Sequence, residues 1–437
     1  MNRFDVVVVG ARCAGSPLAM LLARRGLSVC VLDRASFPSE TPSTHIIQPS
    51  GAQLLDRMGL LDTALAAGGA ELSRFTLVSD EVRIEAHVDD VSVRPSLSIR
   101  RVTLDALLVE AAGAAGADVR TGSAVTGLLM DDGRVTGVQT ATGPVHASLV
   151  VGADGRHSTV ASLVGAQKYH VVPPGRLPTW AYFEGVSGQA GHALLGRIGE
   201  TAYLAGQTDG GLYMAAVTTA FANQPQFDAD RDGYFTTAIR RFPELADALA
   251  GARRVGPIRM VTNWDNYFRQ SAGPGWVLVG DAGHFKDPHP GQGIGDAFRQ
   301  ADRLTEEIVE GLRTDEVDAA TQRWWRWRDR DAYEMYWFAI LMGSPGAQSP
   351  LQRSIFRSIA ADEEASRMLF RVLNRDLRPS QLFTPRRALC GAAGALRREP
   401  RQAKSIAQEM ASSVAQIVEQ ARSGRTPPPG MAAAIWR

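Results

Sequence analysis

Residues 6–15, with the sequence VVVVGARCAG, have the strand and glycines of a dinucleotide-binding turn. The four valines predict a buried parallel strand, and Gly10 permits the tight turn that follows it. Gly15 allows the next helix to pack closely on the strand, so that the helix amides and the positive end of its dipole face a pyrophosphate. Asp33 follows at close to the ~20-residue spacing at which an acidic side chain binds an adenosine ribose. The residues expected to contact a dinucleotide here are Gly10, Arg12, Cys13, Ala14, Gly15, Asp33 and Arg34.

Arg12 stands where the fingerprint has its middle glycine, which normally lets the backbone approach the pyrophosphate. The guanidinium must therefore either point into solvent or reach the phosphates with its own charge. The second arrangement has an electrostatic purpose, because a guanidinium beside a diphosphate offsets its negative charge. We therefore expect Arg12 to contact the pyrophosphate.

Two later segments each continue a short apolar strand into a glycine-containing turn with an aspartate. They are residues 149–158 (LVVGADGRHS) and residues 276–284 (WVLVGDAGH). A Gly-Asp pair after a strand puts a carboxylate at the carboxyl end of that strand, where ligands of open α/β sheets bind. A helix is predicted from about Asp296 to Glu310, so its positive dipole end would face the same edge.

Together, the three segments resemble the class A flavoprotein monooxygenases, the family of p-hydroxybenzoate hydroxylase. The resemblance covers about residues 3 to 330, and three ordered motifs are far more specific than one. It implies FAD as the cofactor, with Asp281 on the ribityl hydroxyls and Arg101 near the phosphate and ribityl region. Arg100 is the competing candidate for the second role. The further residues that the resemblance places on the cofactor are Gln48, Asp154, Gly155, Gly280, Gly291, Gln292 and Gly293.

Three residues near the expected flavin are candidates for catalysis, namely Lys286, His45 and Pro288. Lysine occurs only three times in this chain, so Lys286 stands out in the loop that would run past the flavin ring. Its ammonium could counter charge on reduced flavin or bind an acidic substrate, or it could simply pair with Asp287 in solvent. His45 would lie near the flavin edge or the substrate entrance, although an isolated histidine is more often a surface hydrogen-bonding group. The sequence shows no evident catalytic base.

We expect an α/β fold in which a Rossmann-like FAD-binding domain is interleaved with a mostly antiparallel β-sheet substrate domain and followed by a C-terminal helical region. The FAD-binding domain would comprise residues 1–72, 99–168 and 264–325, the sheet domain 73–98 and 169–263, and the helical region 326–437. Alternating apolar and polar residues predict the strands of the second sheet. Because side chains alternate across a strand, about half of the expected substrate contacts must face away. These expected contacts are Trp180, Tyr182, Tyr203, Tyr213 and Met214.

Aromatic residues between Trp324 and Phe338 recur at helical spacing, which predicts packing rather than a cofactor site. The run Trp325-Arg326-Trp327 is similar to the tryptophan motif of flavin-dependent halogenases. However, it lacks the Ile-Pro that should follow and lies on the wrong side of the Gly-Asp motif. An apolar stripe from Ile406 to Val418 predicts a final helix that packs as an end helix, covers the active site or forms a dimer contact; the first is the default expectation.

The composition limits the remaining possibilities. With 437 residues, 45% of them hydrophobic, the chain can bury a large core in two or three subdomains. A net charge of +1 argues against an electrostatic nucleic-acid surface. No run approaches the ~18 apolar residues of a membrane span, and the chain opens on the predicted cofactor strand, so we expect a cytoplasmic protein. Three scattered cysteines argue against a disulfide framework or a zinc site, and abundant arginine, alanine and glycine indicate a GC-rich bacterial genome.

The resemblance implies an enzyme in which NAD(P)H reduces FAD and dioxygen is trapped as a flavin C4a-hydroperoxide. The distal oxygen would then hydroxylate or epoxidise an aromatic or polyketide-like small molecule of secondary metabolism. A reductase of isoprenoid double bonds and a flavin-dependent halogenase share the scaffold and stay open, as does a non-enzymatic flavin-fold binding or regulatory module. Whether the chain forms a homodimer and whether a separate flavin reductase supplies electrons also stay open.

Overall fold

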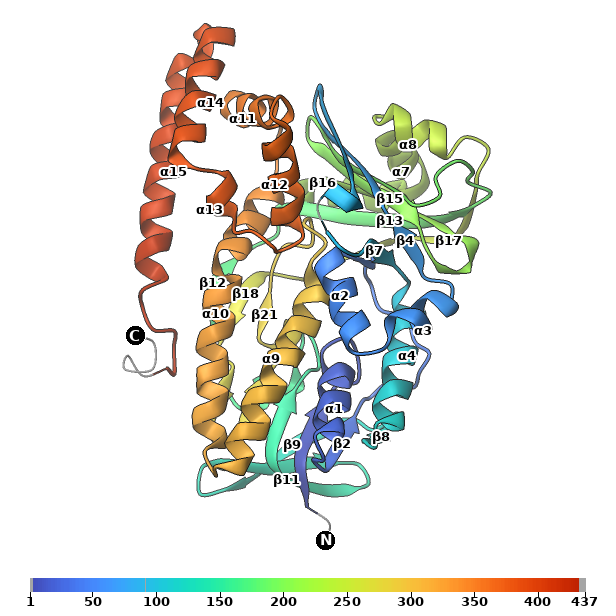
Figure 1. The fold of residues 1–437 in the computed structure, drawn as a ribbon, viewed down its shortest axis with the longest axis vertical. Helices are drawn as coiled ribbons and strands as arrows, with labels where there is room; N and C mark the ends of the chain where they lie inside the picture. The colour runs from blue at the N-terminus through green and yellow to red at the C-terminus, as the bar shows by residue number, and fades with distance from the viewer. Residues whose placement is uncertain (1–2, 91, 432–437) are drawn as a thin grey trace.

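The computed structural model describes residues 3–90 and 92–431. The lower half of the molecule in Figure 1 is built on an eight-stranded sheet whose central path runs β19-β20-β11-β1-β2-β8. The strands along this path are parallel except for the edge strand β19, and the hairpin β9–β10 extends β11. The bounds are β1 Phe4–Val9, β2 Val29–Leu32, β8 Asp118–Arg120, β9 Val125–Asp131, β10 Arg134–Thr140, β11 Gly143–Gly152, β19 Ala272–Gly273 and β20 Trp276–Leu278.

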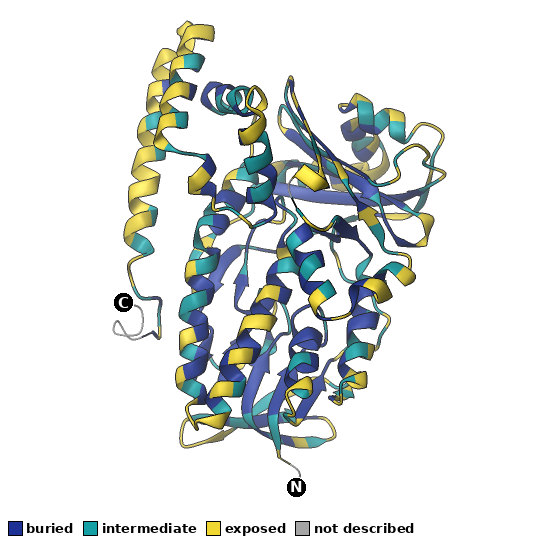
Figure 2. Cartoon of the chain, viewed as in Figure 1, coloured by how far each residue is buried: buried dark blue, intermediate teal, exposed yellow. Residues whose placement is uncertain are grey.

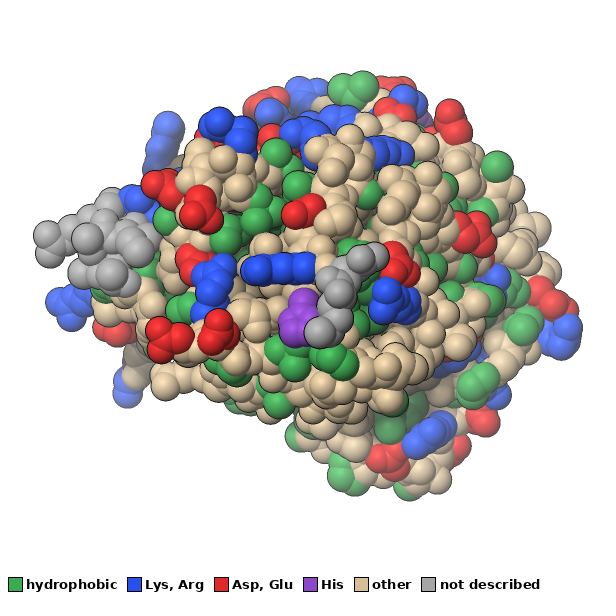
Figure 3. Space-filling view, turned by 90° about the horizontal axis from the view of Figure 1, so that it is seen from below, with side chains coloured by type: hydrophobic (Ala, Val, Ile, Leu, Met, Phe, Trp, Pro, Cys, Tyr) green, Lys and Arg blue, Asp and Glu red, His purple; other side chains and the backbone are tan. Residues whose placement is uncertain are grey.

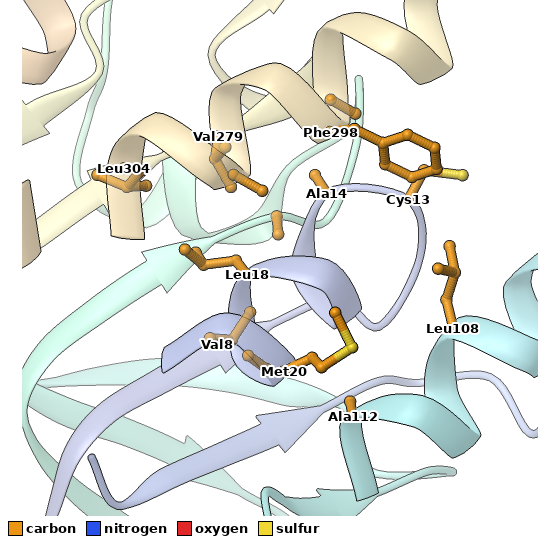
Figure 4. Close-up of a cluster of buried hydrophobic side chains, with 14 of the residues drawn as sticks. Val8, Cys13, Ala14, Leu18, Met20, Leu108, Ala112, Val279, Phe298 and Leu304 are labelled. Atoms are coloured by element: carbon orange, nitrogen blue, oxygen red, sulfur yellow. The ribbon is translucent and has the colours of Figure 1, made fainter. Parts of the chain in front are cut away.

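Both faces of this sheet are covered, and for that reason β1 is a run of valines rather than an alternating strand. Val6 and Val8 pack with α1, α4 and α9 on one face, whereas Val7 and Val9 pack with α5 on the other. Figure 4 shows side chains of α1, α4 and α9 gathering beside Val8. The helices of this half are α1 Gly15–Arg24, α2 Pro49–Arg57, α3 Leu61–Ala66, α4 Arg101–Ala114, α5 Thr159–Leu163 and α9 Gly293–Arg313.

A second sheet of seven strands occupies the upper right of Figure 1, in the order β17-β13-β16-β15-β14-β5-β6. All of its pairs are antiparallel except β14 with β5, which confirms the mostly antiparallel sheet predicted from the alternating segments. The bounds are β5 Arg74–Ser79, β6 Val82–His87, β13 Arg176–Glu184, β14 His192–Ile198, β15 Thr201–Gln207, β16 Tyr213–Ala220 and β17 Arg253–Met260.

One face of the second sheet is covered by three short helices that the strand pattern did not predict. They are α6 Gln224–Ala229, α7 Arg231–Ile239 and α8 Pro243–Ala248. Phe227, Phe235 and Leu245 of these helices are fully or nearly fully buried against the sheet. Local signals for the helices do exist, because prolines occupy the first turns of α6 and α8 and Asp230 caps α7 by accepting from the Gly233 amide.

Two small sheets connect the halves and cross the predicted domain boundaries. The first contains β3 Ile46–Ile47, β7 Ser96–Ser98 and β4 Ala70–Leu72, and the second contains β12 Lys168–Val172, β18 Asn266–Arg269 and β21 His284–Phe285. Strand β7 lies in the segment 73–98 that we assigned to the substrate sheet, yet it pairs with β3 and β4. Strand β12 spans the expected boundary between residues 168 and 169.

The C-terminal region is helical, as predicted, and its first helix begins before residue 326. The helices are α10 Val317–Met342, α11 Pro350–Ala360, α12 Glu363–Leu373, α13 Pro379–Leu382, α14 Pro385–Arg398 and α15 Ala403–Ser423. Trp324 and Trp325 are fully buried in α10, and their indole N–H groups donate to the Gln300 carbonyl oxygen and the Tyr169 hydroxyl. These tryptophans therefore serve packing, as their spacing predicted.

Helix α15 differs from the default expectation of a packed end helix. Ile406 is buried, but Val414, Ile417 and Val418 of the apolar stripe are exposed. Figure 2 shows the outer helix α15 almost entirely in the colour of exposed residues. Only the start of the stripe is buried, although the far end of α15 is held to α10 by the Tyr333 hydroxyl, which donates to the Gln420 carbonyl oxygen.

Among residues 3–90 and 92–431, no helix combines the length and the apolar character needed to cross a membrane. The same residues hold no group of three or more His, Cys, Asp or Glu side chains that could bind a metal ion. On the face shown in Figure 3, basic and acidic side chains are interspersed rather than gathered into one basic patch.

Candidate cofactor and substrate site

The turn after β1 has no room for a side chain at its two fingerprint glycines. Gly10 has a φ of +103°, and a Cβ there would lie 2.5 Å from the Ala153 carbonyl oxygen. A Cβ on Gly15 would lie 1.8 Å from the Gly10 carbonyl oxygen, so α1 packs directly on the turn. No side chain caps the N-terminus of α1, and its first turn has no acidic residue. The helix end is thus suited to an anion such as a pyrophosphate.

Arg12 has partners within the chain that its sequence context did not indicate. Its Nη1 lies 2.6 Å from Asp105, its Nη2 donates to the Ser39 hydroxyl at 2.9 Å, and its guanidinium lies over the Phe37 ring. A carboxylate therefore holds the arginine beside the turn, and its contact with the pyrophosphate stays a prediction. Asp105 lies 93 residues away in the chain, so no local sequence pattern indicated this pair.

Asp105 is fully buried and pairs with both Arg12 and Arg101. Arg101 Nε and Nη2 donate to its two oxygens at 2.9 and 3.0 Å, and the Cys13 thiol donates to it at 3.4 Å. Arg101 and Asp105 are four residues apart on α4, a spacing that could have revealed the pair. Arg100 instead pairs with Asp209 at 3.0 Å, so of the two candidate arginines only Arg101 contacts Asp105. Burial raises the pKa of Cys13 above its ordinary range.

We expect Asp105→Asn to destabilise the fold more than Arg12→Gly does. The first change leaves the buried Arg101 without its counter-charge, whereas Arg12 is about a quarter exposed and its loss leaves Asp105 still paired with Arg101. Chemical denaturation of the two variants measures the difference, and equal losses of stability would contradict it. Arg12→Gly also tests the cofactor role directly, because unchanged FAD affinity would mean that the arginine serves only the fold.

Asp33 and Arg34 lie at the end of β2. The Asp33 carboxylate accepts from the Ala11 amide at 2.7 Å and from the Ala35 amide at 2.8 Å, so it fixes the turn around Gly10. Arg34 is exposed. Cys13 and Ala14, also expected at the cofactor, are buried beside the turn.

Asp281 occupies the short helical turn Gly280–Ala282 directly after β20. Within the described residues its carboxylate makes no hydrogen bond and no ion pair, although burial raises its pKa to about 6 against the opposing charges of Arg156 and Arg101. A partly buried carboxylate without a hydrogen-bond partner among the described residues has the chemistry of a ligand contact. Gly280 stands next to Ala14, because a Cβ on Gly280 would lie 2.8 Å from the Ala14 Cβ. The ends of β1 and β20 thus meet at one edge. FAD fits the groups there, because the amides of α1 suit its pyrophosphate and the Asp281 carboxylate can accept from its hydroxyls.

Asp154 and Gly155 follow β11 at the same edge. Asp154 caps α5, because it accepts from the Ser158 hydroxyl at 2.5 Å and from the Thr159 amide at 2.6 Å. Both carboxylate oxygens of Asp154 therefore already accept hydrogen bonds from groups of the protein. Gly155 has a φ of +77° and open space around its Cα.

The cofactor loop, defined here as residues 286–292, leads from β21 into α9. Lys286 Nζ lies 2.6 Å from both Asp296 and the Gln292 side-chain oxygen, and only 4% of the lysine side chain is exposed. The alternative partner considered for Lys286 was Asp287, and that pairing is absent from the described contacts. Gln48 donates to the Pro290 carbonyl oxygen at 3.0 Å and so ties the loop to α2. In the rest of the loop and the start of α9, Pro288 is exposed, Gly291 has a φ of +65°, and Gly293 begins the helix with open space beside it.

Asp296 holds two buried cations at the start of α9. Arg375 Nε lies 3.4 Å from its second oxygen, so the carboxylate joins the cofactor loop to the end of α12. Burial would raise the pKa of Asp296, but the charges of Lys286 and Arg375 outweigh it and lower the pKa to about 2. Burial also lowers the pKa of Lys286 to about 8, although Asp296 opposes the change.

Asp296→Asn is expected to destabilise the protein by about 2 kcal/mol at neutral pH. Because the folded pKa lies below the ordinary value of 3.8, this stabilisation is present above about pH 4 and is lost as the pH falls toward 2. Urea denaturation between these pH values measures it. Asp302→Asn on the same helix is the control, because that carboxylate is about half exposed and lies 3.8 Å from its nearest cation. Equal losses in the two variants would contradict the assignment.

His45 lies at the junction of the two halves and has a φ of +45°. Its ring stacks on Tyr182 with the centroids 5.6 Å apart, and its Nδ1 lies 3.0 Å from the Ser43 carbonyl oxygen. The Nε2 atom is buried without a described partner, and burial lowers the pKa of the ring to about 4. His45 is therefore neutral at physiological pH, and its Nε2 is free to meet a ligand.

The five expected substrate contacts divide between the two faces of the second sheet. Trp180, Tyr182 and Met214 share one face with Met335 and Phe338 of α10. Tyr203 and Tyr213 belong to the opposite face and pack among the helices α6–α8. These two tyrosines are therefore corrected from substrate contacts to core residues, because the register of the strands turns them away from the cofactor edge.

A parallel sheet with a glycine turn and, two strands away, an aspartate without a hydrogen-bond partner at the same edge is an arrangement that can hold FAD. A family model described as "FAD binding domain" matches residues 3–323, and the chain belongs to this family. The chain is thus an FAD-dependent oxidoreductase, and its monooxygenase relatives fit the class A flavoprotein monooxygenases.

Three curated relatives cover most of the chain. It is 29% identical over 336 residues to 6-methylpretetramide 4-monooxygenase of Streptomyces rimosus, covering 71% of this chain and 76% of the relative. It is 26% identical over 336 residues to digeranylgeranylglycerophospholipid reductase 1 of Methanococcoides burtonii, covering 72% and 77%. It is 27% identical over 344 residues to rifampicin monooxygenase of Streptomyces venezuelae, covering 70% and 64%.

Solved structures share the fold. The flavin-dependent brominase Bmp2 aligns with a TM-score of 0.72 over 92% of this chain and 100% of its own, at 18% identity. PqsL of P. aeruginosa in complex with 2-aminobenzoylacetate aligns with a TM-score of 0.67 over 85% and 99%, also at 18% identity.

Proposed function

We propose that this protein is a monooxygenase that takes electrons from NAD(P)H and transfers one atom of dioxygen to an aromatic or polyketide-like small molecule. The observation that carries the proposal is the identity with 6-methylpretetramide 4-monooxygenase over 336 residues. An alignment that covers 71% of this chain must include the middle strands of the substrate sheet as well as the Gly280-Asp281 turn. The likeness therefore extends beyond the glycine motif that many dinucleotide-binding proteins share.

The residues at the carboxyl edge would hold FAD. Asp281 would accept hydrogen bonds from the ribityl hydroxyls, and Arg101 would offset the charge of the phosphates beside the N-terminus of α1. The backbone amides from Gly291 to Gly293 would face the pyrimidine side of the ring, where the N-terminus of α9 favours negative charge. FAD, when bound, supplies the electron transfer and the activation of dioxygen, while the protein supplies position and exclusion of water.

The buried sheet face of Trp180, Tyr182 and Met214 would receive the apolar part of the substrate. Such a face would keep water out of the site and so favour reaction with the substrate. Lys286 acts as a positioning residue in this proposal, because its ammonium is committed to Asp296 and Gln292 and so fixes the cofactor loop against α9.

The test is to mix FAD-loaded protein with NADPH and a phenol without oxygen, and then to admit air. Flavin bleaching that the phenol accelerates, followed by oxygen uptake, is the expected result. Oxygenation only after chemical reduction of the flavin would indicate a separate flavin reductase. Bleaching with no oxygen uptake under any condition would contradict the monooxygenase and favour a reductase.

A reductase of an isoprenoid double bond is the second candidate. The relative from Methanococcoides burtonii favours it, because that reductase aligns over as many residues as the monooxygenase does, at 26% identity. The two candidates differ in oxygen uptake, since a reductase passes its electrons to a carbon–carbon double bond instead of dioxygen.

A further inference from the structure

Three side chains form a hydrogen-bonded row between the cofactor loop and the substrate sheet. The Asp287 carboxylate accepts from His289 at both the ring Nδ1, at 2.5 Å, and the backbone amide, at 3.1 Å. On the other side of the ring, His289 Nε2 lies 3.0 Å from the Thr218 hydroxyl on β16. Asp287 is buried, whereas His289 and Thr218 are each partly exposed. None of the three is used by the cofactor contacts described above.

The order of partners fixes which atoms carry the protons. A carboxylate can only accept, so the hydrogen of a neutral His289 must sit on Nδ1. Nε2 then has a free lone pair and the Thr218 hydroxyl donates to it. A base that one group orients and that accepts from a hydroxyl is the arrangement that activates hydroxyl groups in enzymes.

Gly343, at the end of α10, keeps the carboxylate in place. A Cβ at this position would lie 2.0 Å from Asp287 Oδ2, so any larger residue would push the acid away from the histidine. The charged groups near the row are Arg176 of β13, whose pKa responds to Asp287, and Lys286, whose ammonium is committed to Asp296. Arg176 is itself held by the carbonyl oxygens of Glu200, Ser344 and Gly346.

Thr218 lies on the sheet face that we assign to the substrate. Met214, Ala216 and Thr218 alternate along β16, and the first two belong to the same buried cluster as Trp180 and Tyr182. In the register of the sheet, Thr218 stands opposite Pro178 and Met214 stands opposite Tyr182. The segment of β16 from Thr218 to Met214 is thus about 13 Å long at ~3.3 Å per residue. His289 closes one end of this face and His45 closes the other.

We propose that His289 is the general base of the substrate site, that Asp287 orients it, and that Thr218 links it to a hydroxyl group of a phenolic substrate. This inference rests on the proposed function and adds to it the base that the sequence did not reveal. Because His289 Nε2 lies 3.0 Å from the Thr218 hydroxyl, the imidazole can act as a general base through that hydroxyl.

The proton transfer conserves all atoms. The substrate O–H bond breaks and its proton passes to the Thr218 oxygen, which at the same time gives its own hydrogen to His289 Nε2. The products are a substrate oxyanion and an imidazolium that the Asp287 carboxylate stabilises. The oxyanion makes the aromatic ring richer in electrons and hence more reactive toward an electrophilic oxygen. The imidazolium returns its proton to solvent before the next turnover.

Ionisation of a bound dye tests the proposal without any oxygenation. The probe is alizarin, a polycyclic phenol whose colour changes when it loses a proton. FAD-loaded protein, kept oxidised and without NADPH, is titrated with alizarin at a series of pH values. We expect bound alizarin to ionise about one pH unit or more below free alizarin. His289→Gln should bind the dye and abolish that shift, and Asp287→Asn and Thr218→Val should reduce it.

Thr219→Val is the matched control. Thr219 is the neighbour of Thr218 on β16, faces the other side of the sheet, and has a buried hydroxyl without a described partner. This variant should keep the full shift and the FAD content of the wild type. If His289→Gln does not fold, the shift measured in Thr218→Val tests the proposal instead. That variant is expected to fold because it only replaces a hydroxyl by a methyl group.

Three results would overturn the inference: no binding of alizarin by the wild type, no shift in the wild type, or an unchanged shift in His289→Gln and Thr218→Val. The oxygen-uptake experiment fails or succeeds independently of these results. Loss of oxygen uptake with a retained dye shift would therefore contradict the monooxygenase alone, while oxygen uptake without a shift would contradict only the base.

Discussion

Asp281→Asn is expected to weaken FAD binding about 10- to 100-fold, because hydrogen bonds to a charged group contribute ~1.5–3 kcal/mol. The carboxylate has no partner among the described residues, so its acceptor capacity is available to the ribityl hydroxyls. Titration of the apoprotein with FAD, followed by quenching of flavin fluorescence, gives the affinity. Asp302→Asn, which changes an exposed acid on α9, should leave that affinity unchanged.

The same substitution should make the apoprotein more stable above pH 6. The folded pKa of Asp281 is about 6 and the ordinary value is 3.8, so the folded state favours the protonated acid. The ionised Asp281 carboxylate therefore destabilises the folded apoprotein increasingly as the pH rises from about 4 to about 6, by up to on the order of 2–3 kcal/mol. Asn removes this cost. If Asp281→Asn lowered apoprotein stability at pH 8, a structural role for the carboxylate would replace the cofactor role.

Gly15→Ala is expected to destabilise the fold by more than ~3 kcal/mol and to abolish retention of FAD. The added Cβ would lie 1.8 Å from the Gly10 carbonyl oxygen and 3.1 Å from a Val8 methyl group. Backbone atoms cannot yield as a flexible side chain can, so α1 would have to move away from the sheet. Thermal unfolding and the FAD content of the purified variant measure the two effects.

Gly113→Ala is the control for this prediction. Gly113 lies within α4, and a Cβ there meets no heavy atom within 4 Å. Alanine is the better helix former by ~0.5–1 kcal/mol, so this variant should be slightly more stable than the wild type. A similar loss of stability in both variants would show that the effect at Gly15 does not come from the close approach.

The cofactor edge was predictable from sequence because its signals are local. The valines of β1, the turn at Gly10 and the Gly280-Asp281 pair each lie within a few residues of one another, and backbone geometry alone brings the strand ends together. The partner of Arg12 was not predictable in this way. An arginine next to a diphosphate turn indicates phosphate binding, and only the fold reveals that the buried Asp105 also lies beside it.

The substrate face shows the same limit. Alternation predicted that some of the five residues must face away, but only the register of β16 against β13 and β15 decides that Tyr213 does so. The hydrogen-bonded row of Asp287, His289 and Thr218 joins residues up to 71 positions apart in the chain, so no local sequence pattern predicts it. Helices α6–α8 are a different case, since their proline and aspartate signals are local and were outweighed by the strand pattern around them.

The most direct test of the cofactor site is an experimental structure of the protein with FAD. We expect the pyrophosphate at the N-terminus of α1 beside Gly10, and the ribityl hydroxyls within hydrogen-bond distance of Asp281. We also expect the pyrimidine side of the ring at the amides that lead into α9. An FAD molecule bound elsewhere, or one that leaves the Asp281 carboxylate without a contact, would contradict this site.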